Sequence, residues 1–168
     1  MDSERLTSLD YFRGMKPQEV EVVATAMTED AWWEGSTIVQ QGDQRGCVYF
    51  ILEGCVRIER SLQNGEIVMV GRLGPGAVFG ILGVLDGTDR AATCVAEGTA
   101  RCAVMERSDF LDLMAGTTPL ALRFQLAVLR CLSRDIRSTN RRLTELAALP
   151  ACVVSIEDLE EIFEQPQS

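Results

Sequence analysis

Short β-rich runs separated by glycines fill residues 32–105, and this pattern constrains the fold more than any other feature. The runs are Thr37–Val39, Val48–Leu52, Cys55–Arg60, Ile67–Val70, Ala92–Ala96 and Ala100–Met105. Asn64–Gly65 lies between two of them and is the strongest short hairpin signal, because both residues tolerate a positive φ. Many short strands with close glycine punctuation favour a double-sheet β barrel of jelly-roll type over a parallel α/β sheet.

Helical patterns flank this β-rich region. Leu6–Met27 reads as two short helices, with Pro17 in the first turn of the second. Ser108 is a favourable N-cap for a helix that continues to Met114. A much longer helical stretch covers residues 119–147. We therefore predict an α+β fold, a β jelly-roll barrel with N-terminal helices and a long C-terminal dimerisation helix.

The length of 168 residues is typical of one domain, which we place at residues 1–149. Residues 150–168 form a short acidic tail. Within it, Ile156–Glu164 reads either as one acidic amphipathic helix with Ser155 as N-cap or as a mobile tail.

The long helix carries its apolar residues on a seven-residue grid. One row is Leu122, Leu129, Ile136 and Leu143; the row three positions further on is Gln125, Leu132, Thr139 and Leu146. At 1.5 Å per residue this helix is about 40 Å long, too long for one small barrel to cover. We predict a homodimer through the helix Leu122–Leu146. The alternative is that this face packs on the barrel of its own chain.

The chain has no histidine, and this absence excludes several chemistries. No imidazole is present to serve as a general base, to activate a serine or cysteine nucleophile, or to bind a metal. The six cysteines stand singly in apolar runs without any C-x-x-C pair, so we interpret them as reduced core residues. No convergent carboxylate pair or catalytic motif is evident, and neither an enzyme nor a metal site is expected.

The charge balance limits the partners. Lys plus Arg number 16 against 25 Asp plus Glu, a formal net charge of -9, which disfavours direct DNA binding. No run approaches the roughly 18 apolar residues that a spanning helix needs, and residues 1–5 carry no secretory signal pattern. We expect a cytoplasmic protein without a membrane partner.

The glycine-rich segment from Leu73 to Ala96 carries the strongest functional signal. A turn of helix starting near Gly80, followed by Arg90 and two alanines, suits a phosphate cradle: glycine permits close approach and the guanidinium binds two oxygens. No G-K-[ST] follows, so a P-loop is disfavoured. Two plainer interpretations stay open: barrel-corner glycines, and a surface ion pair of Arg90 with Asp86 or Asp89.

This segment resembles the phosphate-binding cassette of cyclic nucleotide-binding domains, the family of the bacterial catabolite activators and of the regulatory subunits of cyclic-AMP-dependent kinase. The resemblance covers nearly the whole chain. Its motifs are G-S-T-I-V-Q-Q-G-D at 35–43, V-Y-F-I-L-E-G-C-V-R-I at 48–58, L-G-P-G-A-V-F-G at 73–80 and G-T-D-R-A-A-T at 87–93. The bacterial activators continue into a DNA-binding domain, whereas this chain is expected to act without one.

The resemblance implies a ligand, cAMP or cGMP, and a set of contacts. Arg90 would pair with the cyclic phosphate. The other implied binding residues contribute backbone N–H groups (Ala91 and Ala92), shape the cassette turn (Gly80 and Leu82), pack near the base (Leu52 and Val70) or reach the base from the long helix (Thr139 and Asn140).

Ile81 is a departure from the family pattern. The family's F-G-E places a glutamate against the ribose 2′-hydroxyl, and this chain has F-G-I. Loss of a hydrogen bond to a charged acceptor weakens binding roughly ten- to a hundred-fold.

Two functions remain open. The first is a dimeric regulatory sensor that binds a phosphate-bearing nucleotide and signals to an unidentified protein partner. The second is a ligand-free protein-interaction module on the same fold, in which Ile81 and neighbouring apolar residues fill the pocket.

Overall fold

The computed structural model describes residues 2–44 and 46–148, without the side chain of Leu146. The chain divides into two compact units, Met1–Cys131 and Leu132–Ser168, and each is described by itself. The predicted tail helix with Ser155 as N-cap lies outside the described residues. The predicted domain boundary at residue 150 also lies there and stays a prediction.

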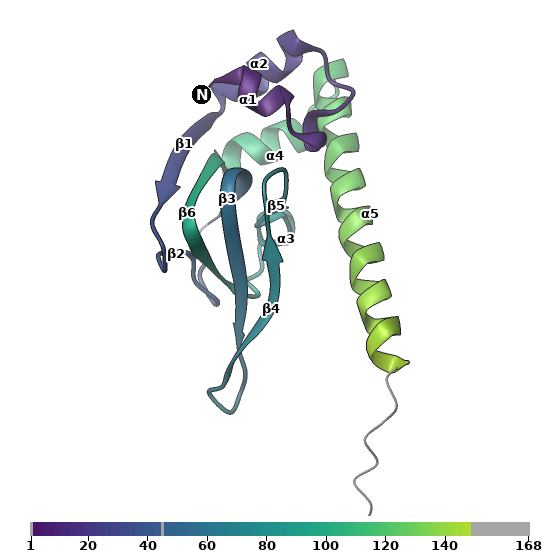
Figure 1. Cartoon of the computed structure of the whole chain (residues 1–168). Coiled ribbons are helices and arrows are strands. Elements are labelled where there is room, and N and C mark those ends of the chain that lie inside the picture. Colours follow the sequence, from purple (N-terminus) through teal and green to yellow (C-terminus); the bar gives the residue numbers. More distant parts are fainter. Residues whose placement is uncertain (1, 45, 149–168) are drawn as a thin grey trace, which may run out of the picture. The chain divides into compact units, whose positions relative to one another are not determined.

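Six antiparallel strands form the body of the first unit (Figure 1). They are β1 Met27–Trp32, β2 Thr37–Val39, β3 Cys47–Ser61, β4 Ile67–Leu73, β5 Val78–Phe79 and β6 Thr93–Glu106. The strand order is β1-β6-β3-β4, with β2 also paired to β6 and β5 to β3. The two long strands β3 and β6 are therefore central, and every other strand pairs with one of them.

Each long strand runs through both halves of the barrel. The first half of β3 pairs with the second half of β6, as at Ile51 opposite Cys102, beside β1 and β5. The second half of β3 pairs with the first half of β6, as at Ile58 opposite Cys94, beside β2 and β4. The predicted jelly-roll barrel with flanking helices is confirmed.

The boundaries of the central strands differ from the prediction. Four separate strands were expected where β3 and β6 each run without a break. Gly54 and Gly98 have φ angles of +78° and +71° and produce bends inside continuous strands rather than turns between strands. The β3–β6 register shifts on both sides of Glu53, which accommodates the bend.

Strand β1 contradicts the sequence interpretation at the N-terminal side. The helical entry was expected to reach Met27, but Met27–Trp32 is a strand paired with β6. Its polar composition, with Thr28, Glu29 and Asp30 in succession, hides the two-residue alternation of a half-buried strand.

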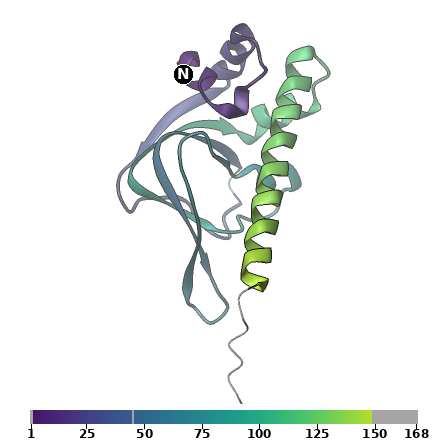
Figure 2. The ribbon, with the colours of Figure 1, turned by 45° about the vertical axis from the view of Figure 1, so that its right-hand side comes forward.

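The Asn64–Gly65 hairpin is confirmed between β3 and β4, where Ser61 pairs with Ile67 (Figure 2). Only Gly65 adopts a positive φ, +84°. The Gly65 N–H donates to the Leu62 carbonyl at 3.0 Å. The turn therefore uses the conformational freedom of Gly65 and does not require a positive φ at Asn64.

The N-terminal helices are α1 Ser3–Thr7, the 3-10 turn η1 Asp10–Phe12 and α2 Pro17–Thr25. Pro17 begins α2 as predicted, and the Glu19 carboxylate accepts a hydrogen bond from the Lys16 N–H at 2.8 Å.

The C-terminal helices are α4 Arg107–Ala115 and α5 Pro119–Ala147. Helix α4 starts before Ser108, so Ser108 is not its N-cap; Glu106 holds that position. Helix α5 has the predicted extent, and its first part belongs to the first unit. Gln125, a polar member of the predicted second row, contacts the end of α4 instead of facing a partner helix. Its Nε2 donates to the carbonyls of Leu113, Met114 and Gly116.

Two buried clusters hold the first unit together. The barrel core is built mainly from small and β-branched residues: Val39, Ile51, Val56, Phe79, Cys94, Ala96, Ala100, Cys102 and Val104. The second cluster is aromatic and joins η1, β3, α4 and α5: Tyr11, Phe12, Phe50, Phe110 and Phe124. Burial of these rings fixes the helices against the end of the barrel.

Candidate functional site

The predicted turn of helix after Gly80 is present as α3, Ile81–Asp86. Gly80 is its N-cap with a φ of +88°, and Gly87 closes it with a φ of +72°. A Cβ built on Gly80 would lie 2.7 Å from Arg90 Nη1 and 2.7 Å from the Cys47 carbonyl oxygen. Both the backbone angle and the available space therefore require glycine at this position.

Arg90 is buried beside this turn, with only 7% of its surface exposed. Its Nη1 donates to the Gly80 carbonyl at 2.7 Å, and its Nη2 donates to the Cys47 carbonyl at 2.6 Å. Its backbone N–H donates to the Asp43 carbonyl at 2.9 Å, and its own carbonyl accepts from the Gly42 N–H at 2.9 Å. Main chain and side chain are thus both held in place.

The plainer interpretation of Arg90 required a surface position near Asp86 or Asp89. Arg90 is instead buried, and the Asp86 carboxylate accepts hydrogen bonds from the Thr88 hydroxyl at 2.7 Å and the Thr88 N–H at 3.0 Å. These bonds from Thr88 lower the pKa of the Asp86 carboxyl. The geometry favours the cradle over a surface ion pair.

Three polar side chains lie near Arg90: those of Cys47, Tyr49 and Glu106. The Cys47 thiol donates to Glu106 Oε2 at 3.3 Å. Burial, helped by Glu106, raises the pKa of Cys47 to about 11, and burial raises the pKa of Tyr49 to about 12. The Tyr49 ring stacks on Phe79 with centroids 4.8 Å apart. Cys47 and Tyr49 are neutral at physiological pH, so these two groups do not cancel the positive charge of Arg90.

The predicted ligand contacts nearest to Arg90 in the sequence are those of the cassette turn and of the two alanines. Ala91 and Ala92 follow Arg90 directly; in the described part of the chain no hydrogen bond uses the backbone N–H of either residue. Those two N–H groups are available to an anion. Ile81 is buried at 4% exposure, whereas Leu82 is 63% exposed.

Leu52 is buried, and Val70 on β4 is half exposed at a register irregularity of the hairpin. Thr139 and Asn140 lie on the part of α5 that belongs to the second unit, and both are exposed. Their predicted contact with a ligand base stays a prediction.

Three residues around Arg90 were missed by the sequence reasoning. Cys47 holds Arg90 through its backbone carbonyl, which leaves no mark on side-chain identity. Glu106 and Arg107 reach the surrounding elements from the end of β6. Only the glycines at positions 46, 83 and 87 hint at the close approach of a long side chain.

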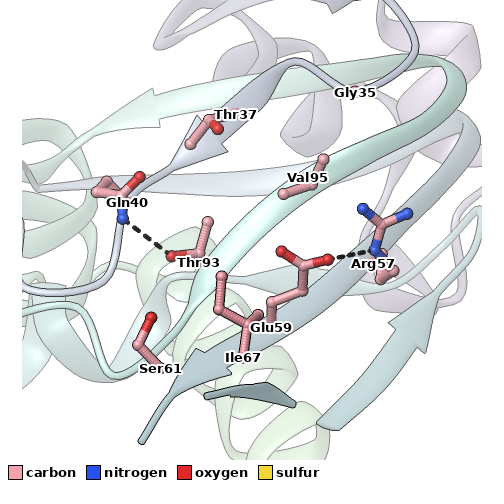
Figure 3. A pocket seen from close by; sticks show the side chains of 9 residues that line it. All are labelled: Gly35, Thr37, Gln40, Arg57, Glu59, Ser61, Ile67, Thr93 and Val95. Atoms are coloured by element: carbon pink, nitrogen blue, oxygen red, sulfur yellow. Dashed lines mark hydrogen bonds and ion pairs between the residues drawn. The ribbon is translucent and has the colours of Figure 1, made fainter. Parts of the chain in front are cut away.

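A separate cavity of about 300 Å³ lies on another face of the sheet (Figure 3). Its lining includes Thr93 and Val95, which alternate along β6 with the core residues Cys94 and Ala96, so the cavity lies on the face opposite the barrel core. Within this lining, Arg57 Nε donates to Glu59 Oε1 at 2.6 Å, and Gln40 donates to the Thr93 hydroxyl at 3.3 Å. None of the predicted site residues lines it.

The described residues, 2–44 and 46–148, also bear on metal binding and on membranes. No group of three or more potential metal-binding side chains occurs there. The cysteines at 47, 55, 94, 102 and 131 form no disulfide within this part of the chain, and the last three are buried. No helix of this part of the chain is long and apolar enough to cross a membrane.

Comparison with known sequences identifies relatives of this arrangement. The family profile described as "Cyclic nucleotide-binding domain" matches residues 32–117, which include α3 and Arg90. The cyclic AMP receptor protein of Thermus thermophilus is 31% identical over 136 residues, 81% of this chain and 61% of that protein. The chain therefore spans about three fifths of the length of this relative.

Solved structures share the fold. A cyclic nucleotide-binding domain from Methylobacillus flagellatus KT superposes with a TM-score of 0.75 at 24% identity, covering 89% of this chain and 84% of that one. The regulatory domain of Toxoplasma gondii PKA, solved with cAMP, gives a TM-score of 0.66 at 26% identity, covering 78% and 48%. With the matched profile and the Thermus relative, these likenesses show that the chain belongs to the cyclic nucleotide-binding domain family.

Proposed function

We propose that this chain is a regulatory module that binds a cyclic nucleotide through Arg90. The observation that carries the proposal is the buried guanidinium, held at the start of α3 and followed by two backbone N–H groups. A guanidinium forms strong, paired hydrogen bonds to phosphate oxygens, so a phosphate is able to compete for Arg90 with the carbonyls of Gly80 and Cys47. The cAMP named for the Toxoplasma domain and the name of the Thermus relative support this ligand class.

Ile81 sets the expected affinity. Its side chain is buried where the family pattern has a glutamate, so a ribose 2′-hydroxyl in the site meets an apolar wall. The missing charge-assisted hydrogen bond weakens binding of cAMP or cGMP by roughly ten- to a hundred-fold. A ligand that does not depend on this hydroxyl loses nothing there.

We further propose that the signal passes through a homodimer formed by α5. Large apolar side chains are exposed along this helix: Leu122, Leu126, Leu129, Ile136 and Leu143. A separate set, Phe124, Val128 and Cys131, is buried. Because the exposed row of Leu122, Leu129, Ile136 and Leu143 repeats every seven residues, a second copy of the helix covers it best.

Three further expectations stay proposals. The module is not an enzyme, and it presents its surface to a protein partner. DNA is not that partner, because a net charge of -9 opposes phosphate binding. The cytoplasmic location stays a prediction.

The second candidate function is a ligand-free interaction module. The buried Ile81 favours it, since an apolar side chain at this position removes one ligand contact. In this case Arg90 acts structurally, tying α3 to β3 through its two carbonyl contacts.

Calorimetric titration with cAMP, cGMP and cyclic di-GMP decides between the two functions. The sensor predicts heat of binding with at least one nucleotide, abolished by Arg90→Ala and retained by Arg60→Ala, which changes an exposed arginine on β3. Ile81→Glu is expected to tighten cAMP binding ten- to a hundred-fold. Absence of heat from every nucleotide in the wild-type protein, with binding appearing only in Ile81→Glu, establishes the ligand-free module.

A further inference from the structure

Two consecutive residues, Glu106 and Arg107, occupy the junction between β6 and α4. Glu106 is the last residue of β6, and Arg107 is the first residue of α4. Their side chains reach different elements around Arg90. Neither residue belongs to the predicted ligand contacts, and neither is part of the barrel core.

Arg107 contacts α3, the short helix that follows Gly80. Its Nη1 donates to the Gly83 carbonyl of α3 at 3.2 Å, and a Cβ built on Gly87 would lie 3.5 Å from its Nη2. Its stem passes over Gly46, where a Cβ would lie only 3.0 Å from Arg107 Cβ. A cation beside the carbonyls at the end of a helix is electrostatically favourable. Arg107 therefore fixes α3 from the side away from Gly80.

Glu106 contacts Cys47, one of the two residues whose backbone carbonyls accept hydrogen bonds from Arg90. Its Oε2 accepts a hydrogen bond from the Cys47 thiol at 3.3 Å, and the Cys47 carbonyl accepts from Arg90 Nη2 at 2.6 Å. The second carbonyl that receives Arg90 belongs to Gly80, at the start of the helix that Arg107 holds. These two acceptors of the Arg90 guanidinium are thus each linked to one residue of the same junction.

The same junction continues into the C-terminal helices. Phe110 of α4 packs edge-on against Phe124 of α5 with centroids 5.5 Å apart. Gln125 of α5 donates to three carbonyls at the end of α4, the shortest contact being 2.8 Å to Gly116. A continuous set of contacts therefore joins Arg90 to the first part of α5.

We propose that Glu106 and Arg107 are positioning residues: they set the orientation of the Arg90 guanidinium and couple its displacement by a bound phosphate to α4. The coupling rests on the proposed function, whereas the positioning exists without ligand. A phosphate that draws Arg90 from either carbonyl shifts α3 or the start of β3, and both shifts reach the junction. Direct contacts between neighbouring residues carry this coupling from Arg90 to the junction.

The first experiment needs no nucleotide. The Arg90 side-chain N–H signals of the ligand-free protein are recorded by ¹⁵N NMR and assigned with Arg90→Lys. Slow hydrogen exchange is expected because two carbonyls hold the guanidinium. Arg107→Met and Glu106→Gln are expected to accelerate this exchange by about tenfold, the loss of one charge-assisted contact. Arg107→Lys retains a donor and restores slow exchange, and Arg60→Met serves as the matched control.

Melting curves separate positioning from a merely structural role. A structural role lowers the melting temperature of Arg107→Met without changing Arg90 exchange well below that temperature. Positioning changes Arg90 exchange at temperatures where the variant is fully folded. If exchange in both Arg107→Met and Glu106→Gln equals that of the wild type, the positioning role is overturned.

The second experiment tests coupling with cAMP. Arg107→Met is expected to weaken binding about tenfold, and its effect is expected to vanish in an Arg90→Lys background, since both changes act through the same guanidinium. Additive effects overturn the coupling. If the wild-type protein binds no nucleotide, the proposed function fails, and the exchange measurement still decides the positioning role.

Discussion

Gly54 and Thr99 touch through their backbones where the two long strands bend together. A Cβ built on Gly54 would overlap the Thr99 carbonyl oxygen and would lie 2.9 Å from the Ala100 Cα. No side-chain rotation relieves such a contact, because both neighbouring atoms belong to the backbone. The bend that closes the barrel therefore depends on the absence of one methyl group.

Gly54→Ala is expected to destabilise the protein by about 3 kcal/mol or more, since it combines this clash with a positive φ. Gly74→Ala is the matched control: a Cβ there meets nothing within 4 Å, so the change should stay within about 1 kcal/mol. Urea unfolding of the two variants measures the difference. Equal midpoints would show that the strands adjust their bend without cost.

Gly80→Ala is expected to impair nucleotide binding more than stability. The new Cβ would lie 2.7 Å from Arg90 Nη1 and would displace the guanidinium from its hydrogen bonds to the Gly80 and Cys47 carbonyls. We expect a loss of cAMP affinity of about tenfold or more by calorimetry, the equivalent of one lost charge-assisted hydrogen bond. Gly76→Ala also has a positive φ but open space, and it controls for backbone strain. Affinity losses that match in the two variants would contradict a specific effect on Arg90.

Leu129→Glu is expected to abolish self-association through α5. A charge placed in the exposed apolar row must be desolvated when a second helix covers it. Sedimentation at micromolar concentration should show a dimer for the wild-type protein and a monomer for the variant. Leu82→Glu, an equally exposed leucine on α3, should leave the dimer intact. A monomeric wild-type protein would reject the dimer.

Buried thiols are expected to make the fold sensitive to alkali. Burial raises the pKa of Cys94 to about 11 and that of Cys102 to about 12, from the ordinary value of 9.0. The folded state then holds protons that the unfolded chain releases, so this stabilisation is complete below pH 9 and is lost as pH rises through 11 to 12.

Thermal melts from about pH 8 to about pH 11 test this expectation, because this range spans the ordinary thiol pKa and the raised pKa of Cys94. The melting temperature should fall progressively above pH 9 in the wild-type protein. The variants Cys94→Ala and Cys102→Ala should each show a shallower fall. Identical pH slopes in wild type and variants would assign the alkaline sensitivity to other groups.

Much of this fold was predictable because local signals and tertiary structure agree. Strand Thr37–Val39 and helix Pro119–Ala147 match their predicted bounds, and the hairpin at Asn64–Gly65 is in place. At the hairpin and at the start of the long helix, a turn residue or a proline marks the boundary chemically. The prediction of α3 succeeded for a similar reason, since Gly80 marks its start.

The errors arise where tertiary contacts override local signals. The sequence pattern divided each long strand into two runs, near Gly54 and near Gly98, yet the strands continue through these glycines because each strand finds a partner on both sides of the bend. Strand β1 has no apolar alternation of its own and is held by its pairing with β6. The support of Arg90 by the carbonyls of Gly80 and Cys47 was invisible, since any residue supplies a carbonyl.

The continuity of β3 and β6 determines which parts of the first unit are able to move. Because both strands cross the whole barrel, neither half of the sheet shifts without carrying the other, and the barrel behaves as a single stiff frame. Displacement is then expected at the terminal pair of the ladder, Cys47 with Glu106, and in elements outside it: residues 40–44 and 87–92, α3 and α4. Arg90 lies in the 87–92 connection and is hydrogen-bonded through its backbone to Gly42 and Asp43, so a ligand bound by Arg90 would act on the part of the unit that is expected to move.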